Sequence, residues 1–369
     1  MTTPEKTPTA ALSYQSAGVD SAMKDRAMPG LAHWVERSFA LRRDFGQVLL
    51  PLGYFANVID LGRGQGLALS TDGVGTKLIV AQLMQRYDTV GIDCVAMNVN
   101  DVLCVGAEPL AILDYIAVEL PSPELLGPLA EGLYRGAEQA QVAIPGGEVA
   151  QVKEMIRGAR PGAAFDLVAA CVGTVRTDRI LTGSKTEPGD AIVGLQSSGV
   201  HSNGLTLARR VLLEQTGWAT DHWVPELGRT VGEALLEPTR IYVQPVLRML
   251  AQDLKIKALA HITSTGFLNL SRADAPAGYV LDALPAPPPV FDLIARLGQV
   301  PKPDMYYTYN MGIGFCIVVA PADAPQVLAI AREAGFEGQI IGHTVHDERK
   351  SVRLPQQKLI GVDDTFIEE

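Results

Sequence analysis

The chain has few of the residues that mark several large classes of protein. It has only 4 cysteines, and none stand in the short paired spacing of a zinc site. All of them, Cys94, Cys104, Cys171 and Cys316, lie in apolar segments. We therefore expect buried, reduced thiols and a cytoplasmic protein.

Positive charge and long apolar runs are also scarce. The 31 lysines and arginines against 41 acidic residues give a net charge of −10, and there is no basic run. This balance argues against nucleic acid or an anionic membrane as a partner. The first eleven residues lack the apolar core of a signal peptide, and the longest uncharged stretch, residues 305–322, contains Asn310, glycines and a proline. We expect neither export nor a membrane span.

The composition that remains suits a globular protein of two domains, and the alternation of strands and helices along the chain predicts a mixed α+β class. Hydrophobic residues make up 47% of 369 residues, enough for two cores. We expect a leading segment over residues 1–60, a first domain over 61–176, a second over 177–350 and a C-terminal tail over 351–369.

Apolar periodicity predicts strands and helices in both halves. In the first half the predicted strands are 66–71, 110–118 and 165–175, and the helices are 76–86, 89–105 and 123–141. In the second half the strands are 191–196, 258–262, 279–281, 311–319 and 339–343, and the helices are 204–214, 237–251, 290–297 and 324–334.

The most informative motif is Ser70-Thr71-Asp72-Gly73-Val74-Gly75-Thr76-Lys77. Asp72 ends a predicted strand, Gly73 and Gly75 allow main-chain N–H groups to approach an anion, and Thr76 begins a helix. Lys77 adds a charge suited to phosphate, although the glycine spacing is not that of a Walker loop. Taken alone, Asp72 is equally consistent with an ordinary turn residue.

Acidic and amide side chains follow on the next predicted helix. Asp93, Asn100 and Asp101 recur at helical spacing on an otherwise apolar helix, where unpaired charge is costly. Mg²⁺ prefers hard oxygen ligands, so Asp72, Asp93 and Asp101 are our predicted metal ligands.

Small polar turns in the rest of the chain supply further candidates. A turn that begins a helix contains Ser198, His201, Ser202 and Asn203. They suit a phosphate or a proton transfer, although the turn in isolation is better interpreted as an ordinary helix cap with a surface histidine. Glu148 follows a Gly-Gly pair and a short strand, and is a candidate metal or nucleotide contact. His261, Thr263 and Asn310 lie at strand ends and would contact substrate.

Together these motifs resemble phosphoribosylformylglycinamidine cyclo-ligases. The likeness runs through Gly91 to Asp101, Leu113-Asp114-Tyr115, Gly146-Gly147-Glu148 and Ser197 to Gly204, and extends from residue 13 to residue 314. It implies an N-terminal sheet that forms a barrel across a homodimer, a C-terminal α+β sandwich and an active site between them.

The resemblance also implies a reaction and a set of roles. ATP activates formylglycinamidine ribonucleotide at its formyl oxygen, and the internal amine then closes the imidazole ring. Lys77, His201 and His261 would be catalytic. The residues at the ATP site would be Asp72, Gly73, Gly75, Thr76, Lys77, Asp93, Asn100, Asp114 and Glu148. Those at the substrate would be Ser198, Ser202, Asn203, Thr263 and Asn310, with Mg²⁺ as the metal.

Three departures leave the substrate open. Gln151 stands where the family usually has an acid, residues 264 and 265 are Ser and Thr in place of glycines, and the loop before residue 66 is altered. A related ATP-dependent enzyme acting on another amide or acid, or a non-catalytic nucleotide-binding dimer, are the alternatives.

Overall fold

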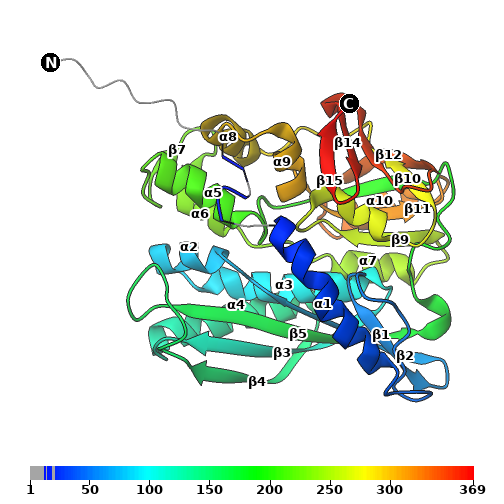
Figure 1. Cartoon of the computed structure of the whole chain (residues 1–369), viewed down its shortest axis with the longest axis horizontal. Helices are drawn as coiled ribbons and strands as arrows, with labels where there is room; N and C mark the ends of the chain where they lie inside the picture. The colour runs from blue at the N-terminus through cyan, green and yellow to red at the C-terminus, as the bar shows by residue number, and fades with distance from the viewer. Residues whose placement is uncertain (1–11, 14, 19–20) are drawn as a thin grey trace.

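The computed structural model describes residues 12, 13, 15–18 and 21–369. Two β-sheets organise these residues, with the first in the lower half of Figure 1 and the second in the upper half. The first sheet has the order β1-β2-β5-β3-β4, in which only β3 and β4 pair in parallel. Its strands are β1 (Asn57–Gly62), β2 (Gln65–Gly73), β3 (Glu108–Val118), β4 (Ala143–Gln151) and β5 (Phe165–Arg176).

Helices α2 (Lys77–Met84), α3 (Asp88–Cys104) and α4 (Pro123–Ala140) accompany the first sheet, and α3 lies directly against it. Glycines let α3 and α4 approach closely, because a Cβ atom at Gly132 would lie 1.9 Å from the Asp88 carbonyl oxygen. Almost every residue of α3 is buried, since the second half of the chain packs on its other side. The acidic groups of α3 therefore lie between the two halves.

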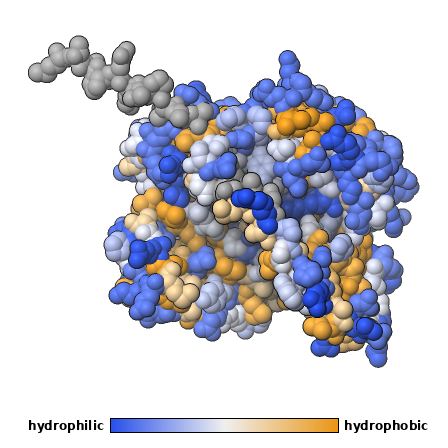
Figure 2. All heavy atoms as spheres, in the orientation of Figure 1, coloured by the Kyte–Doolittle hydropathy of each residue, from blue (hydrophilic) through white to orange (hydrophobic). Residues whose placement is uncertain are grey.

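The other face of the first sheet carries exposed apolar side chains. Strand register places Leu69, Leu113 and Tyr115 on this face, and they are 38%, 47% and 42% exposed. Figure 2 shows apolar surface over the lower half of the molecule, where this sheet lies. Helix α1 (Ser21–Phe39) lies across the front of this half and is exposed along most of its length.

The second sheet has eight strands in the order β15-β14-β13-β10-β12-β6-β11-β9. They are β6 (Ala191–Gln196), β9 (Ile256–His261), β10 (Ala277–Val280), β11 (Ile313–Val319), β12 (Gly338–His346), β13 (Val352–Leu354), β14 (Leu359–Val362) and β15 (Thr365–Glu368). A small hairpin joins β7 (Trp223–Val224) and β8 (Arg229–Thr230).

The helices of this half are mostly short. They are α5 (Leu205–Arg209), which continues as a π-helical turn η2 (Arg210–Gln215), then α6 (Val231–Leu236), α7 (Val243–Leu250), α8 (Pro289–Gly298), α9 (Lys302–Thr308) and α10 (Ala324–Glu333). Short 3₁₀ turns are η1 (Thr177–Arg179), η3 (Gly266–Arg272) and η4 (Pro355–Gln357). No helix among the described residues is long and apolar enough to cross a membrane.

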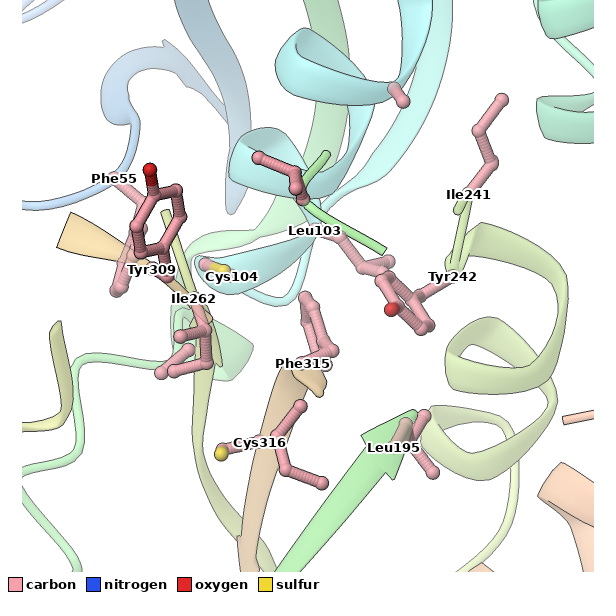
Figure 3. Packing of buried hydrophobic residues seen from close by; sticks show 14 of the residues in the cluster. Phe55, Leu103, Cys104, Leu195, Ile241, Tyr242, Ile262, Tyr309, Phe315 and Cys316 are labelled. Carbon is pink, nitrogen blue, oxygen red and sulfur yellow. The ribbon is translucent and has the colours of Figure 1, made fainter. Parts of the chain in front are cut away.

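Apolar side chains join the two halves into one core. Figure 3 shows Leu103 and Cys104 of α3 close to Tyr242, Ile262 and Phe315 from the second half. All five are at most 1% exposed. The four cysteines are free and buried, as we expected from the sequence.

Most predicted elements are present, and the mixed α+β class is confirmed. Three differences matter for the site. The helix predicted over 237–251 begins only at Val243, because backbone groups of Thr239, Arg240 and Tyr242 bond to side chains of α3 instead. Glu148 lies in the middle of edge strand β4 and not at a strand end. Residues 351–369, which we expected to be a tail, contain three strands of the second sheet.

Candidate active site between the two halves

A buried ion pair stands at the contact between the two halves. The Lys77 Nζ atom lies 2.9 Å from Oδ1 and 2.8 Å from Oδ2 of Asp93, and both side chains are 0% exposed. Nζ also donates to the Glu237 carbonyl oxygen at 2.6 Å. Burial lowers the pKa of Lys77, and the Asp93 carboxylate opposes that shift. The Lys77 ammonium is therefore held between Asp93 of the first half and the Glu237 carbonyl of the second.

Protein donors converge on Oδ1 of Asp93, whereas Oδ2 has only the ion pair with Lys77 among the described residues. Its Oδ1 atom accepts from Thr239 N at 2.8 Å, from Thr239 Oγ1 at 2.6 Å and from Ser202 Oγ at 3.1 Å. The structure gives no support for a metal ion shared by Asp93 and Asp101, which stays a prediction from the sequence. Eight residues of α-helix separate them by about 12 Å along the axis, too far for one small cation. A common helix face does not bring two carboxylates together.

Asp101 and His261 form the second polar contact between the halves. The Asp101 Oδ1 atom lies 2.9 Å from His261 Nδ1, and the Asp101 side chain is 16% exposed while His261 is 0% exposed. Asn100, beside Asp101, donates to the Arg240 carbonyl at 2.9 Å and accepts from Tyr242 N at 3.0 Å. Asn100 thus holds the 240–242 segment in place, and its amide is not free for a nucleotide.

Asp72 lies at the end of β2, close to Asp101. Burial raises the pKa of Asp72 to about 6, the negative charge of Asp101 adds to that rise, and the Gly73 N–H and His261 oppose it. The backbone of Asp72 is fixed by Asn98, which accepts from Asp72 N at 2.9 Å and donates to Asp72 O at 3.1 Å. Two like charges held together in this way would be stabilised by a cation.

The remaining residues of the Ser70–Lys77 motif divide by orientation. Thr76 faces inward, with its hydroxyl 2.8 Å from that of Thr206 on α5. Gly75 has a φ of +72° and open space where a Cβ atom would stand. The part of the motif that is open to a ligand is therefore the Gly75 backbone together with the Asp72 carboxylate.

Asp114 and Glu148 lie on opposite faces of the first sheet. Register aligns Asp72, Ala169, Asp114 and Gly147 in one row, and a Cβ atom at Gly147 would lie 2.4 Å from Asp114 Oδ1. Burial raises the pKa of Asp114. Glu148 pairs with Tyr115 and is on the open, apolar face. Within one chain the structure does not bring Glu148 to Asp72.

The turn of residues 197–204 closes over the ion pair. His201 is buried with a φ of +64°, and its Nε2 atom accepts from Ser198 N at 3.1 Å. Burial lowers the pKa of His201 well below its usual value, so the ring is neutral. The Ser198 hydroxyl donates to the Pro238 carbonyl. These contacts make His201, Ser198 and Ser202 parts of the scaffold around Asp93.

Asn310 braces the same turn. It accepts from Ser197 Oγ at 2.9 Å and from Gly312 N at 2.8 Å, and it donates to the Gly199 carbonyl at 2.8 Å. Its amide is buried and occupied, so the expected contact between Asn310 and substrate is not supported. Asn203 and Thr263 remain half-buried, and within the described residues no protein partner holds either side chain.

Sequence reasoning missed the segment of residues 237–242. It supplies the Glu237 carbonyl to Lys77, Thr239 to Asp93 and the Arg240 carbonyl to Asn100. Pro238 was the available signal, because proline removes a helical donor and forces the residue before it out of the helical region.

The residues present fit a magnesium ion only in part. No cluster of three or more His, Cys, Asp or Glu side chains able to hold a metal occurs in the described part of the chain. Asp72 and Asp101 nevertheless give two neighbouring carboxylates, and Mg²⁺ commonly takes one or two carboxylates together with phosphate oxygens and water. The pair therefore suits a metal that arrives with a nucleotide.

Two family models match this architecture. The N-terminal domain of AIR synthase related proteins matches residues 53–175, and the C-terminal domain matches residues 187–355. The fold and the site between its halves thus define an AIR synthase related protein.

Relatives that align over most of the chain identify the family within this class. A phosphoribosylformylglycinamidine cyclo-ligase of Methanothermobacter thermautotrophicus is 45% identical over 86% of this chain and 91% of its own length. One from Methanocaldococcus jannaschii is 42% identical over 95% of this chain and 96% of its own length. The chain belongs to the phosphoribosylformylglycinamidine cyclo-ligase family.

Solved structures share the fold at low sequence identity. Thiamine-monophosphate kinase from Stenotrophomonas maltophilia has a TM-score of 0.58 at 20% identity and covers 86% of this chain and 93% of its own. T. maritima PurL complexed with FGAR has a TM-score of 0.54 at 18% identity. The match covers 85% of this chain but only 46% of the PurL chain, so our chain spans less than half of that protein.

Proposed function

We propose that this protein is an ATP-dependent ligase that closes formylglycinamidine ribonucleotide to aminoimidazole ribonucleotide, with release of ADP and phosphate, in purine biosynthesis in the cytoplasm. The observation that carries the proposal is the contact of Asp72, Asp101 and His261 where the two halves meet. Family membership supports it, because the cyclo-ligase relatives align over nearly their full length. Such alignment does not favour a related enzyme with another substrate.

The chain's own residues would supply positioning and charge. The Gly75 backbone suits a phosphate, and Asp72 with Asp101 would hold Mg²⁺, which when bound neutralises phosphate charge. His261, which is 0% exposed and contacts Asp101 through Nδ1, would position the Asp101 carboxylate. Asn203 and Thr263 are the polar side chains still free to contact the ribonucleotide.

Lys77 and Asp93 would position other groups and would not contact the reactants. Their ion pair ties α3 to the 237–242 segment and to the 197–204 turn, so it fixes the positions of the two halves. This replaces the expected direct contact of Lys77 with phosphate. His201, buried and neutral, would likewise hold its turn and not transfer a proton.

Phosphate release by the purified chain with Mg²⁺-ATP tests the activity. We expect release to depend on formylglycinamidine ribonucleotide and to match formation of the aminoimidazole product. The control omits the ribonucleotide and measures background ATP hydrolysis. ATP binding without turnover of the ribonucleotide would contradict the proposal.

The open face of the first sheet supports a homodimer. Leu69, Leu113 and Tyr115 together expose an apolar face with Glu148 at its edge, and such faces mark association sites. Two first sheets meeting here would form a barrel across the dimer. Glu148 would then face the partner chain, which accounts for its distance from Asp72.

Leu113→Glu is expected to separate that dimer, because it buries a charge in the contact. In sedimentation, the wild type should behave as a particle of two 39.4 kDa chains, and the variant as a single chain. Ile367→Glu, at an exposed position on β15 of the second sheet, is the matched control and should stay dimeric. A wild-type chain that sediments as a monomer at micromolar concentration would exclude the proposed assembly.

A further inference from the structure

The turn after β9 contains a strained threonine. Thr265 has a φ of +71°, in the left-handed region that favours glycine. Among the non-glycine residues with positive φ in the described ranges, it is the one with a β-branched side chain. Branching at Cβ makes this conformation costly, and such strain persists only where the surroundings impose it or function requires it.

The Thr265 carbonyl accepts from Leu268 N at 3.2 Å, but the side chain makes no such bond among the described residues. Its side chain is half-buried, and within the described residues its hydroxyl makes no hydrogen bond. The hydroxyl side chains of Thr263 and Ser264 before it are also half-buried and unbonded in the same part of the chain. Three consecutive half-buried hydroxyl groups thus have no hydrogen-bond partner in the part of the chain that the structure describes.

The backbone of this turn is firmly held. Asn269 donates from Nδ2 to the Ser264 carbonyl at 2.9 Å and to the Gly266 carbonyl at 2.8 Å. Gly266 is pressed against α9, since a Cβ atom there would lie 2.0 Å from the Tyr306 carbonyl oxygen. The turn is therefore a rigid support for its side chains, which is what a binding contact needs.

The turn also lies next to the candidate active site. It follows His261 by two residues, and His261 contacts Asp101. Asp101, which contacts His261, acts electrostatically on Asp72. A neutral hydroxyl in the turn can donate to an anionic oxygen without adding a buried charge.

We infer that Thr265 is a specificity-determining residue whose hydroxyl donates to a phosphate oxygen of a bound reactant. The inference rests on the proposed function, which brings two phosphorylated molecules, ATP and a ribonucleotide, to this junction. The strained backbone is retained because it holds the hydroxyl toward that oxygen. Thr265 lies outside the groups that we predicted from the sequence to contact substrate.

Three substitutions separate the hydroxyl from the strain. Thr265→Val keeps the branched side chain and loses the donor, so we expect the KM of one reactant to rise about 10-fold or more with little change in Tm. Thr265→Ser keeps the donor and should retain a KM close to that of the wild type. Thr265→Gly loses both donor and strain, so Tm should rise by up to ~3 °C while KM rises as in the valine variant.

Gln299→Gly is the matched control. Gln299 has a φ of +49° at the exposed end of α8, on a different loop of the second half. Relief of its strain should leave both KM values unchanged. A kinetic effect confined to Thr265 would then come from the lost hydroxyl and not from a freer backbone.

Separate titrations of the two reactants identify the source of the phosphate. A rise in the KM for ATP alone would place the contact on the nucleotide, and a rise for the ribonucleotide alone would place it on the substrate. Wild-type KM values for both reactants in Thr265→Val would overturn the inference. If the wild type itself has no turnover, the proposed function fails, and the Kd values of ATP and the ribonucleotide in the same variants decide the role of Thr265.

Discussion

Asp93→Asn is expected to lower the free energy of unfolding by about 3–5 kcal/mol, because it leaves the Lys77 ammonium buried without a counter-charge. Both side chains are 0% exposed, so water cannot replace the lost carboxylate. The change also turns an acceptor of hydrogen bonds from Thr239 and Ser202 into a group that is half donor. Urea unfolding of the two proteins at neutral pH measures the difference.

An exposed ion pair provides the control for Asp93→Asn. Arg248 and Glu333 join α7 to α10, with side chains 47% and 65% exposed. Glu333→Gln should leave the unfolding midpoint nearly unchanged, since exposed pairs are screened by water. An Asp93→Asn protein as stable as the wild type would show that Asp93 is not the counter-charge of Lys77.

This expectation differs from the one that the sequence alone supports. Helical spacing correctly placed Asp93 and Asp101 on one side of α3, and the apolar surroundings correctly indicated burial. Spacing gives no distance to a group elsewhere in the chain, however, and Lys77 is 16 residues earlier. Folding brings Lys77 from the glycine loop and Thr239 from the 237–242 segment to Asp93 on α3, and helical spacing cannot predict either contact.

Fold prediction succeeded where patterns are local and failed where they are not. Strands β2, β5 and β6 and helices α3, α4 and α10 carry strong apolar periodicity, and they occur close to their predicted positions. Helix α1 was missed because it is exposed along most of its length, so it has no apolar stripe to detect. The strands of residues 352–368 are short, and pairing with the sheet rather than local sequence makes them strands.

Resemblance to a family located the site more reliably than it assigned roles within it. The motifs around residues 72, 101, 201, 261 and 310 do converge at the junction of the two halves. Asn310 and His201 nevertheless contact the 197–204 turn, although the buried Nδ1 atom of His201 has no hydrogen-bond partner among the described residues. A family motif identifies a residue without giving its role. The hydrogen bonds of the folded chain indicate whether that role is structural or is contact with a ligand.

Asp101→Asn is expected to keep the fold and remove most of the turnover, by ~100-fold or more, because it removes charge at nearly constant volume. The remaining amide oxygen still accepts from His261 Nδ1, so the contact between the halves persists. Asp72 and Asp101 are like charges that repel each other, so loss of the Asp101 charge should leave Tm unchanged or slightly higher. This outcome is the reverse of that for Asp93→Asn, where stability falls first.

The dependence of the rate on Mg²⁺ concentration distinguishes a metal and phosphate role for Asp101 from a structural role. The Mg²⁺ concentration for half-maximal rate should rise in Asp101→Asn, whereas a structural defect would lower kcat at every Mg²⁺ concentration alike. Asp166→Asn is the control, because Asp166 is exposed on the same sheet. Wild-type turnover in Asp101→Asn would remove this carboxylate from the site, and Asp72 alone would then have to hold the ion.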